Sequence, residues 1–352
     1  MNLITSLSLM VTYQCNVACK HCGPFCGPKE QDWMTYDEIL DVINQADTLG
    51  ATNIVFTGGE PSLLGEKLNR LLEYIRDKTN VESTRIVTNA KWASTYDKAY
   101  KKLKSWKESG LIELNISCGE YHQEFIPISS VINAFKAGCD LNYDTVLLAG
   151  EFIKGETSTT QLSDFENELG EILVNPSNMM PYSKKLWGLS TGAVMAYGRG
   201  KKYVKDDMLI LSDEKNIQSQ CGDVNSVITI HPNGSVTACC GVMVREESPL
   251  TIGNWRESSL LDILQTSNED LILNWVKYVG LKDMKSWLVK KDPDLKDEIG
   301  DQHVSICDLC AKIMYNSKCV KLLFEEGAER NDAIITNKIS QEATIYNPNY
   351  EL

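Results

Sequence analysis

The first 200 residues alternate between short apolar segments typical of strands and longer segments with a helical apolar period. The strand-like segments lie at residues 6–12, 53–57, 85–88, 112–117, 145–148 and 186–191. Strands that alternate with helices form a parallel sheet with right-handed crossovers. We therefore predict an α/β fold, a curved sheet in the form of a partial (β/α)6 barrel. In such folds, active residues gather at the carboxyl ends of the strands.

The helices between these strands are also marked in the sequence. Thr35-Tyr36-Asp37-Glu38 forms a capping box, and Gly50 stands where the helix that it opens should end. Further helices are expected around residues 68–75, 94–108, 131–135 and 161–173.

After about residue 200 the pattern changes. Two short strand-like runs flank Asn233-Gly234, which is a strong hairpin signal. Residues 253–298 have a helical pattern, and a Cys-x2-Cys pair follows. We predict a partial barrel over 1–200, a small hairpin and helix domain over 201–328 with a helical insertion at about 253–300, and a tail over 329–352 without clear period.

Composition narrows the possible functions. The net charge of −13 argues against nucleic-acid binding. The sequence has no run of 18 apolar residues, so we expect no membrane span. The first residues lack a basic stretch followed by an apolar core, so we expect no signal peptide and a cytoplasmic protein. Twelve cysteines in a reducing compartment indicate metal binding or catalysis.

Three of these cysteines, Cys15, Cys19 and Cys22, follow the first predicted strand with the spacing C-x3-C-x2-C. Three thiolates on a short loop can hold three irons of a four-iron cluster and leave the fourth iron open. Zinc is the alternative, with Cys26 as its fourth ligand.

The second predicted strand ends in Thr57-Gly58-Gly59-Glu60-Pro61. Two glycines at the end of a strand let the backbone approach a ligand closely, and Glu60 can hold an ammonium group. Taken alone, the same residues are also compatible with an ordinary turn.

Together, the two motifs resemble those of the radical S-adenosylmethionine enzymes over roughly residues 5–200. The resemblance implies that Cys15, Cys19 and Cys22 bind a [4Fe-4S] cluster, whose open iron binds S-adenosylmethionine. Gly58, Gly59 and Glu60 match the motif that holds the methionyl amine, and His21 takes the position expected to contact adenine. One electron from an external donor, such as flavodoxin or ferredoxin, then generates a 5′-deoxyadenosyl radical that removes hydrogen from a substrate.

Other polar residues at strand ends match the family less specifically. Thr88 and Asn89 end the third strand and Ser117 ends the fourth, where the family contacts its cofactor; they also suit ordinary strand ends. Glu120 and His122 are expected either to touch substrate or to cap a loop. Arg199 is expected to hold a carboxylate, or to be a surface residue in a basic run.

A second set of cysteines lies after residue 200: Cys221, Cys239, Cys240, Cys307 and Cys310. It is similar to the small twitch domain of some radical enzymes, which implies a second, auxiliary [4Fe-4S] cluster held by Cys221, Cys239, Cys307 and Cys310. A structural zinc site is the alternative.

The remaining thiol of this set is Cys240. Neighbouring side chains on a strand point to opposite faces, so Cys240 is expected to be free if Cys239 binds the cluster. The pattern resembles that of radical epimerases of ribosomally made peptides, in which a thiol returns hydrogen to the substrate radical. The chain departs from those enzymes at Ala90, where glycine is usual, and at Cys118, where an acidic residue is common. The alternative for Cys240 is a buried structural cysteine.

Three hypotheses for function follow. The first is an epimerase that acts on the α-carbon of a peptide residue or on a sugar of the aminocyclitol type, with Cys240 as the hydrogen donor. The second is a radical dehydrogenase or thioether-forming maturase, with His122 or Glu120 as the base. The third is a metal-binding scaffold without catalytic activity.

Overall fold

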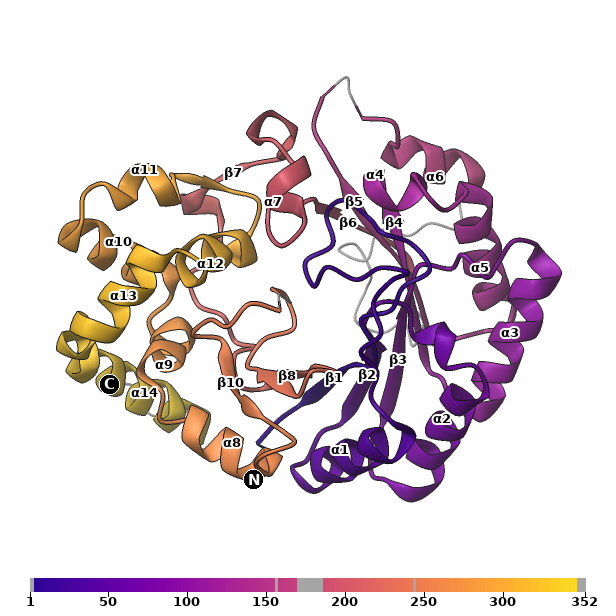
Figure 1. Ribbon diagram of the computed structural model, residues 1–352, viewed down its shortest axis with the longest axis horizontal. Helices are drawn as coiled ribbons and strands as arrows, with labels where there is room; N and C mark the ends of the chain where they lie inside the picture. Colours follow the sequence, from indigo (N-terminus) through magenta and orange to yellow (C-terminus); the bar gives the residue numbers. More distant parts are fainter. Residues whose placement is uncertain (1–2, 156–157, 170–185, 243–244, 347–352) are drawn as a thin grey trace. The chain divides into compact units, whose positions relative to one another are not determined.

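A computed structural model describes residues 3–155, 158–169, 186–242 and 245–346 of the protein (Figure 1). The chain divides into two compact units. Unit 1 contains residues 1–210 and 230–234, and unit 2 contains residues 211–229 and 235–352.

The centre of unit 1 is a run of parallel strands in the order β1-β2-β3-β4-β5-β6. The strands are β1 (Ser6–Met10), β2 (Asn53–Thr57), β3 (Ser83–Thr88), β4 (Glu113–Gly119), β5 (Thr145–Phe152) and β6 (Leu186–Ala193). Each strand pairs with the next along the chain, so the carboxyl ends all lie at one edge. The predicted α/β partial barrel is confirmed.

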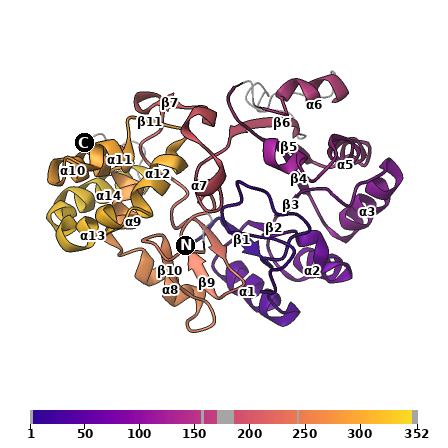
Figure 2. The ribbon, with the colours of Figure 1, turned by 45° about the horizontal axis from the view of Figure 1, so that its top comes forward.

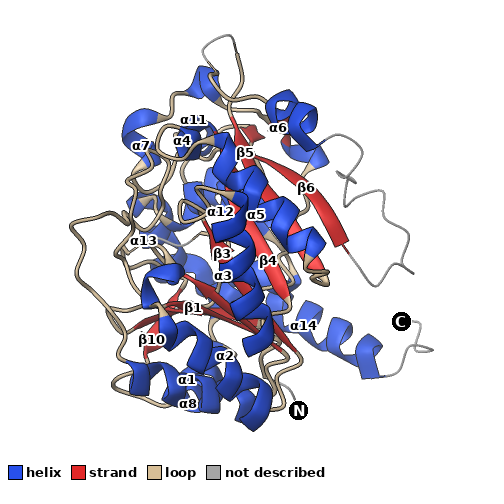
Figure 3. Cartoon of the chain, turned by 90° about the vertical axis from the view of Figure 1, so that its right-hand side faces the viewer, coloured by secondary structure: helices blue, strands red, loops and turns tan. Residues whose placement is uncertain are grey.

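Helices cover one side of these strands, as Figures 2 and 3 show for α2, α3 and α5. The helices of unit 1 are α1 (Tyr36–Thr48), α2 (Glu66–Lys78), α3 (Tyr96–Ser109), α4 (Glu120–Gln123), α5 (Ile128–Asp140), α6 (Leu162–Leu169) and α7 (Gly200–Tyr203), with 3-10 turns η1 (Pro61–Leu64) and η4 (Asp206–Met208). The helix expected at 161–173 begins as predicted, and its last four positions lie outside the described residues.

The capping box that opens α1 is present in full. Thr35 Oγ1 accepts from the Glu38 amide, and the Glu38 carboxylate accepts from the Thr35 amide. The apolar face of α1 is buried through Ile39, Val42 and Ile43. Because a helix of this length is marginal in isolation, the burial of its apolar face contributes most of its stability.

Unit 2 combines short strands with a set of helices. Its strands are β7 (Ser212–Asp213), β9 (Ser235–Thr237), β10 (Thr251–Asn254) and β11 (Gln302–His303), and β8 (Val227–Ile230) ends at the boundary between the units. Its helices are α8 (Leu260–Ser267), α9 (Leu271–Tyr278), α10 (Leu281–Lys291), α11 (Leu295–Ile299), α12 (Ile306–Met314), α13 (Ser317–Glu326) and α14 (Asn331–Tyr346), with 3-10 turns η5 (Glu214–Asn216) and η6 (Gly327–Arg330).

The structure differs from the sequence prediction at two places in unit 2. Residues 253 and 254, which were expected to be helical, close strand β10 because they pair with β9. The tail, in which no period was found, forms helix α14. Its apolar residues do not form a single stripe, so periodicity alone could not identify this helix. In the part of the chain that the structure describes, no helix is long and apolar enough to cross a membrane.

A buried lysine ties together two segments of unit 2 that are far apart in the sequence. The Lys285 side chain is 7% exposed. Its Nζ donates to the Glu214 carboxylate, to the Gly300 carbonyl oxygen at 2.5 Å and to Asp301 Oδ1 at 3.0 Å. Strands β7 and β11 pair beside this lysine, so its ammonium group holds the segment before Cys221 to the segment before Cys307.

We expect Lys285→Met to destabilise unit 2, because it leaves Glu214 and the Gly300 carbonyl without their charged donor. The loss should be about 1.5 to 3 kcal/mol, the range for hydrogen bonds to charged groups. This corresponds to a fall in Tm of roughly 3 to 10 °C. Tryptophan fluorescence can report the transition, because Trp275 and Trp287 pack together in this unit. Lys290→Met, at an exposed position of the same helix, is the control and should leave Tm unchanged.

Candidate active site

The loop that carries the first three cysteines packs directly on the glycine turn after β2. The Gly59 amide donates to the Thr12 carbonyl oxygen at 2.7 Å, and the Glu60 amide donates to the Gln14 carbonyl oxygen at 3.0 Å. A Cβ atom at Gly59 would lie 2.0 Å from the Gln14 oxygen, and one at Gly58 would lie 2.6 Å from the Thr12 oxygen. Both glycines are therefore required for the backbone of the cysteine loop to approach this turn.

The three cysteines of the loop have surroundings suited to an iron–sulfur cluster. The Cys26 amide donates to Cys22 Sγ at 3.3 Å, and Asn89 Nδ2 donates to Cys15 Sγ at 3.6 Å. Donors of this kind stabilise thiolates and tune the potential of a bound cluster. The Cys26 side chain and amide, opposed by burial, lower the pKa of Cys22 to about 7. Cys15, Cys19 and Cys22 thus fit the cluster that their spacing predicts.

Arg199, in the segment after β6, also holds the cysteine loop. Its Nη1 donates to the Cys19 carbonyl oxygen at 2.9 Å and its Nη2 to the Cys26 carbonyl oxygen at 2.7 Å. Its amide donates to the Cys22 carbonyl oxygen at 3.0 Å. A Cβ atom at Gly198 would lie 2.2 Å from the Gly23 oxygen, so the segment after β6 touches the loop closely. The predicted contact of Arg199 with a carboxylate stays a prediction.

Glu60 is fully buried and connects the ends of two strands. Its Oε1 accepts from Thr88 Oγ1 at 2.7 Å and from the Ser62 amide at 3.1 Å, and its Oε2 accepts from the Asn89 amide at 3.0 Å. The Thr88 hydroxyl also accepts from Trp92 Nε1 at 2.9 Å. Thr88, Asn89 and Glu60 therefore form one network at the carboxyl ends of β2 and β3, where the sequence placed cofactor contacts.

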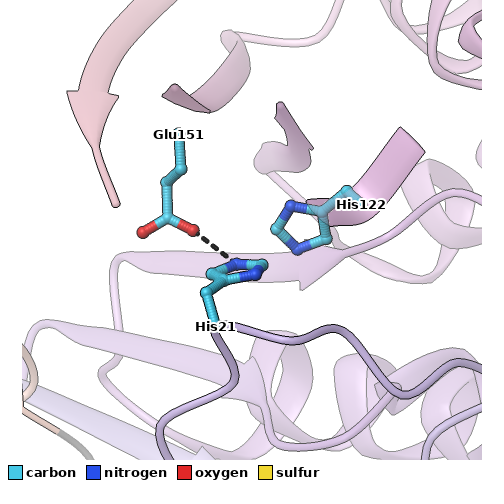
Figure 4. A group of neighbouring side chains, drawn as sticks. All are labelled: His21, His122 and Glu151. Atoms are coloured by element: carbon cyan, nitrogen blue, oxygen red, sulfur yellow. Dashed lines mark ion pairs between the residues drawn. The ribbon is translucent and has the colours of Figure 1, made fainter. Parts of the chain in front are cut away.

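His21 lies beside His122 of helix α4, which follows β4, and beside Glu151 near the end of β5 (Figure 4). Its Nε2 donates to Glu151 Oε2 at 2.8 Å, and its ring stacks on Tyr121 at 5.5 Å and meets the edge of His122 at 4.6 Å. Burial lowers the pKa of His21, but the hydrogen bond and charge of Glu151 outweigh burial and raise it. Donor atoms of His21, His122 and Glu151 lie within 4.8 Å of one another, a spacing that a metal ion could occupy.

The imidazole of His122 is a poor base in this environment. Burial, and next the neighbouring His21, lower the pKa of His122 to about 4. A group with this pKa is neutral at pH 7 and binds a proton only weakly. Its Nδ1 is buried and has no hydrogen-bond partner among the described residues.

Glu120 caps a loop of its own chain. The residue is buried, with 5% of its surface exposed. It accepts hydrogen bonds from the Ser158 hydroxyl, from the amide and hydroxyl of Thr159 and from the Thr160 amide, at 2.9 to 3.1 Å. Its role with substrate stays a prediction. Ser117 lies in β4, half-buried, two residues before the end of the strand.

Unit 2 brings the later cysteines together. Cys310 is buried and interacts electrostatically with Cys239, Cys307 and Cys221. The amides of Gly241 and Val242 donate to Cys239 Sγ at 3.2 and 3.5 Å. A Cβ atom at Gly241 would lie 2.8 Å from Cys307 Sγ. Four neighbouring thiols with backbone donors at sulfur fit an auxiliary iron–sulfur cluster.

Cys240 belongs to the same neighbourhood. It is half-buried and interacts with Cys239 and Cys221, and burial raises its pKa to about 12. Strand β9 ends at Thr237, so strict strand alternation does not apply to the Cys239-Cys240 pair. The assignment of Cys239 as the ligand and Cys240 as the free thiol stays a prediction.

Two contributors to the site were missed by the sequence analysis. Glu151 pairs with His21, and Lys91 Nζ donates to the Asn16 carbonyl oxygen of the cysteine loop at 3.0 Å. Strand β5 extends to Phe152, four residues beyond its predicted end, which places Glu151 within the strand. An acidic residue at the carboxyl end of a barrel strand was the available signal for Glu151.

Comparison with protein families finds two matching regions in the chain. Residues 9–152 match the model of the Radical SAM superfamily, and residues 221–277 match the model of an iron–sulfur cluster-binding domain named SPASM. The first match contains the loop of Cys15, Cys19 and Cys22 together with the glycine turn. The second contains Cys221, Cys239 and Cys240.

Several curated proteins are similar in sequence to this chain over different lengths. YydG of Bacillus subtilis (strain 168), a protein assigned to peptide biosynthesis, is 21% identical over 91% of this chain and 95% of its own length. The GTP 3′,8-cyclase of Limosilactobacillus fermentum is 28% identical over 45% of this chain, which spans about half (48%) of the cyclase.

Two solved structures with bound S-adenosylmethionine are among the chains that match this one, at low similarity. The enzyme anSMEcpe with a Cp18Cys peptide has a TM-score of 0.49, with 14% identity over 75% of this chain and 82% of its own. BtrN with 2-DOIA has a TM-score of 0.41, with 14% identity over 78% of this chain and 87% of its own. The family models, the cysteine loop and the glycine turn agree, and the chain contains a Radical SAM domain followed by an iron–sulfur cluster-binding domain.

Proposed function

We propose that this enzyme inverts the α-carbon of a residue in a peptide. The observation that carries the proposal is a fifth thiol, Cys240, beside the four cysteines suited to the auxiliary cluster. The likeness to YydG along nearly the whole chain supports a peptide substrate, because that relative is assigned to peptide biosynthesis.

The cofactors define the chemistry that the chain must control. When bound, the first cluster and S-adenosylmethionine supply a one-electron cleavage of the sulfonium, which yields a radical able to remove a hydrogen atom from substrate. Cys15, Cys19 and Cys22 would hold that cluster, and Arg199 fixes their loop by donating to the carbonyl oxygens of Cys19 and Cys26. His21 is oriented by Glu151 and offers its ring to the adenine.

The step assigned to Cys240 is hydrogen-atom transfer to the substrate. The S–H bond of Cys240 breaks and a C–H bond forms at the substrate radical, on the face opposite to the one that lost hydrogen. A thiyl radical remains on Cys240, and one electron from the external donor and one proton restore the thiol. An S–H bond is weaker than a typical C–H bond, so a thiol is a competent hydrogen donor to a carbon radical.

The competing oxidation needs a base at the substrate instead of a hydrogen donor. The two side chains that the sequence offered for this role are poorly suited to it. The Glu120 carboxylate is occupied by four donor groups of its own loop, and His122 has a pKa of about 4. These observations favour epimerisation over dehydrogenation.

We expect Cys240→Ala to form 5′-deoxyadenosine at a rate close to that of the parent enzyme, while the inverted product falls by about 10²-fold or more, the scale for loss of a group that transfers hydrogen. Cys139→Ala, at a buried cysteine of α5, is the matched control and should retain both activities. Products can be separated by chiral analysis after hydrolysis. Continued formation of the inverted product by Cys240→Ala would show that another group donates hydrogen.

The source of the returned hydrogen can be tested with solvent label. A thiol exchanges its proton with water, so in deuterated water the product should carry one deuterium at the inverted carbon. Mass spectrometry with fragmentation locates the label. A product lighter by two hydrogens and without deuterium would contradict epimerisation and indicate oxidation.

Arg199→Met should weaken retention of the first cluster. Removing the guanidinium takes one donor from each of the Cys19 and Cys26 carbonyl oxygens. The iron content should therefore fall from about eight toward about four per chain, since each cluster contains four irons. Iron and sulfide analysis after gel filtration measures this. Lys202→Met, at an exposed neighbouring position, is the control and should retain both clusters. An unchanged iron content in Arg199→Met would show that the loop is stable without this contact.

A further inference from the structure

Helix α3 and the segment before it carry a concentration of positive charge in an acidic chain. Residues 91–107 include six lysines and a single acidic residue, Asp97, whereas the whole chain has a net charge of −13. The lysines are Lys91, Lys98, Lys101, Lys102, Lys104 and Lys107. Local charge of opposite sign to the rest of the protein attracts partners that the remaining surface repels.

The surface beside this helix is hollowed. A cavity of about 360 Å³ lies at the start of α2 and along α3, and its lining includes Lys98, Lys101, Lys102 and Trp92. We call these four residues the lysine patch. Lys98 and Lys101 are exposed, and Lys102 Nζ lies 5.6 Å from the centre of the Trp92 ring. Burial lowers the pKa of Lys102. Glu66 is the acidic member of the lining.

The patch is connected to the first cysteine cluster by a short series of contacts. Trp92 Nε1 donates to Thr88 Oγ1 at 2.9 Å. The next residue after Thr88, Asn89, donates through Nδ2 to Cys15 Sγ at 3.6 Å. Lys91, beside Trp92, reaches the cysteine loop itself at the Asn16 carbonyl oxygen. A partner seated on the patch is therefore separated from a cluster ligand by few side chains, which shortens the path for an electron.

We propose that the lysine patch is the docking surface for a small acidic redox protein that carries a reduced flavin. The proposal rests on the radical reaction of the preceding section, which requires one electron from outside the chain. The flavin loses one electron and the group held by Cys15, Cys19 and Cys22 gains it; no bond forms or breaks between the two proteins. Exposed lysines supply the attraction, and Trp92 supplies an apolar contact at the centre of the patch.

A charge-reversal pair tests the surface by binding. Lys98→Glu/Lys101→Glu changes the two exposed lysines, and Lys290→Glu/Lys296→Glu makes the same change in net charge at exposed positions of unit 2. A bacterial flavodoxin is the probe, and fluorescence anisotropy over a series of salt concentrations is the measurement. The patch variant should bind flavodoxin about tenfold more weakly at low salt, with a smaller salt dependence, because opposed surface charges now repel. The control variant should bind as the parent does.

Measuring activity with two different reductants separates an effect on flavodoxin docking from an effect on the reaction itself. With flavodoxin as donor, the patch variant should need about tenfold more flavodoxin for half-maximal formation of 5′-deoxyadenosine. With dithionite, a small reductant that needs no docking surface, its rate should equal that of the parent enzyme.

Three outcomes would overturn the proposal: equal flavodoxin binding by the patch and control variants, equal flavodoxin requirements, or a raised peptide KM under dithionite, which would assign the patch to the substrate. If the parent enzyme forms no 5′-deoxyadenosine with dithionite, the proposed function fails, and the anisotropy measurement still decides the docking surface by itself.

Discussion

The site depends on the backbone contact between the cysteine loop and the glycine turn after β2. Carbonyl oxygens of Thr12 and Gln14 accept hydrogen bonds from the amides of Gly59 and Glu60, in space that any side chain at Gly59 would fill. This contact fixes the loop at the carboxyl end of β1, so the three thiols gather where neighbouring parallel strands also end. A metal-binding loop held by its own backbone leaves its side chains free for ligation.

The remaining supports of the loop come from strands that are distant in sequence. Asn89 and Lys91 reach it from the end of β3, and Arg199 reaches it after β6. Since the strands are parallel and in sequential order, each contributes the residue that follows its carboxyl end to the same region. The architecture thereby surrounds one reactive position with donors and charges drawn from most of the first 200 residues.

Much of the fold was accessible from sequence because its signals are local. Alternating apolar segments located all six strands, and the Thr35 capping box marked the start of α1. Helix α14 was not predicted, because its apolar residues are scattered around its circumference and its formation depends on neighbours in unit 2. Strand β10 was not predicted for a similar reason, because its pairing with β9 overrides the weak local preference for helix at residues 253 and 254.

The candidate site also has a part that the sequence predicted and a part that only the structure revealed. The spacing of Cys15, Cys19 and Cys22, the glycine turn and the later cysteines predicted metal clusters and, through their resemblance to the radical S-adenosylmethionine enzymes, the cofactor, because ligand type and spacing within a loop are local properties. Only the tertiary structure decided that Arg199 binds loop carbonyls, that Glu120 caps the segment after residue 157 and that Glu151 meets His21. Each of these contacts joins residues at least 38 positions apart, and a pairing over such a separation is selected by the packing of strands and loops, which no local pattern encodes.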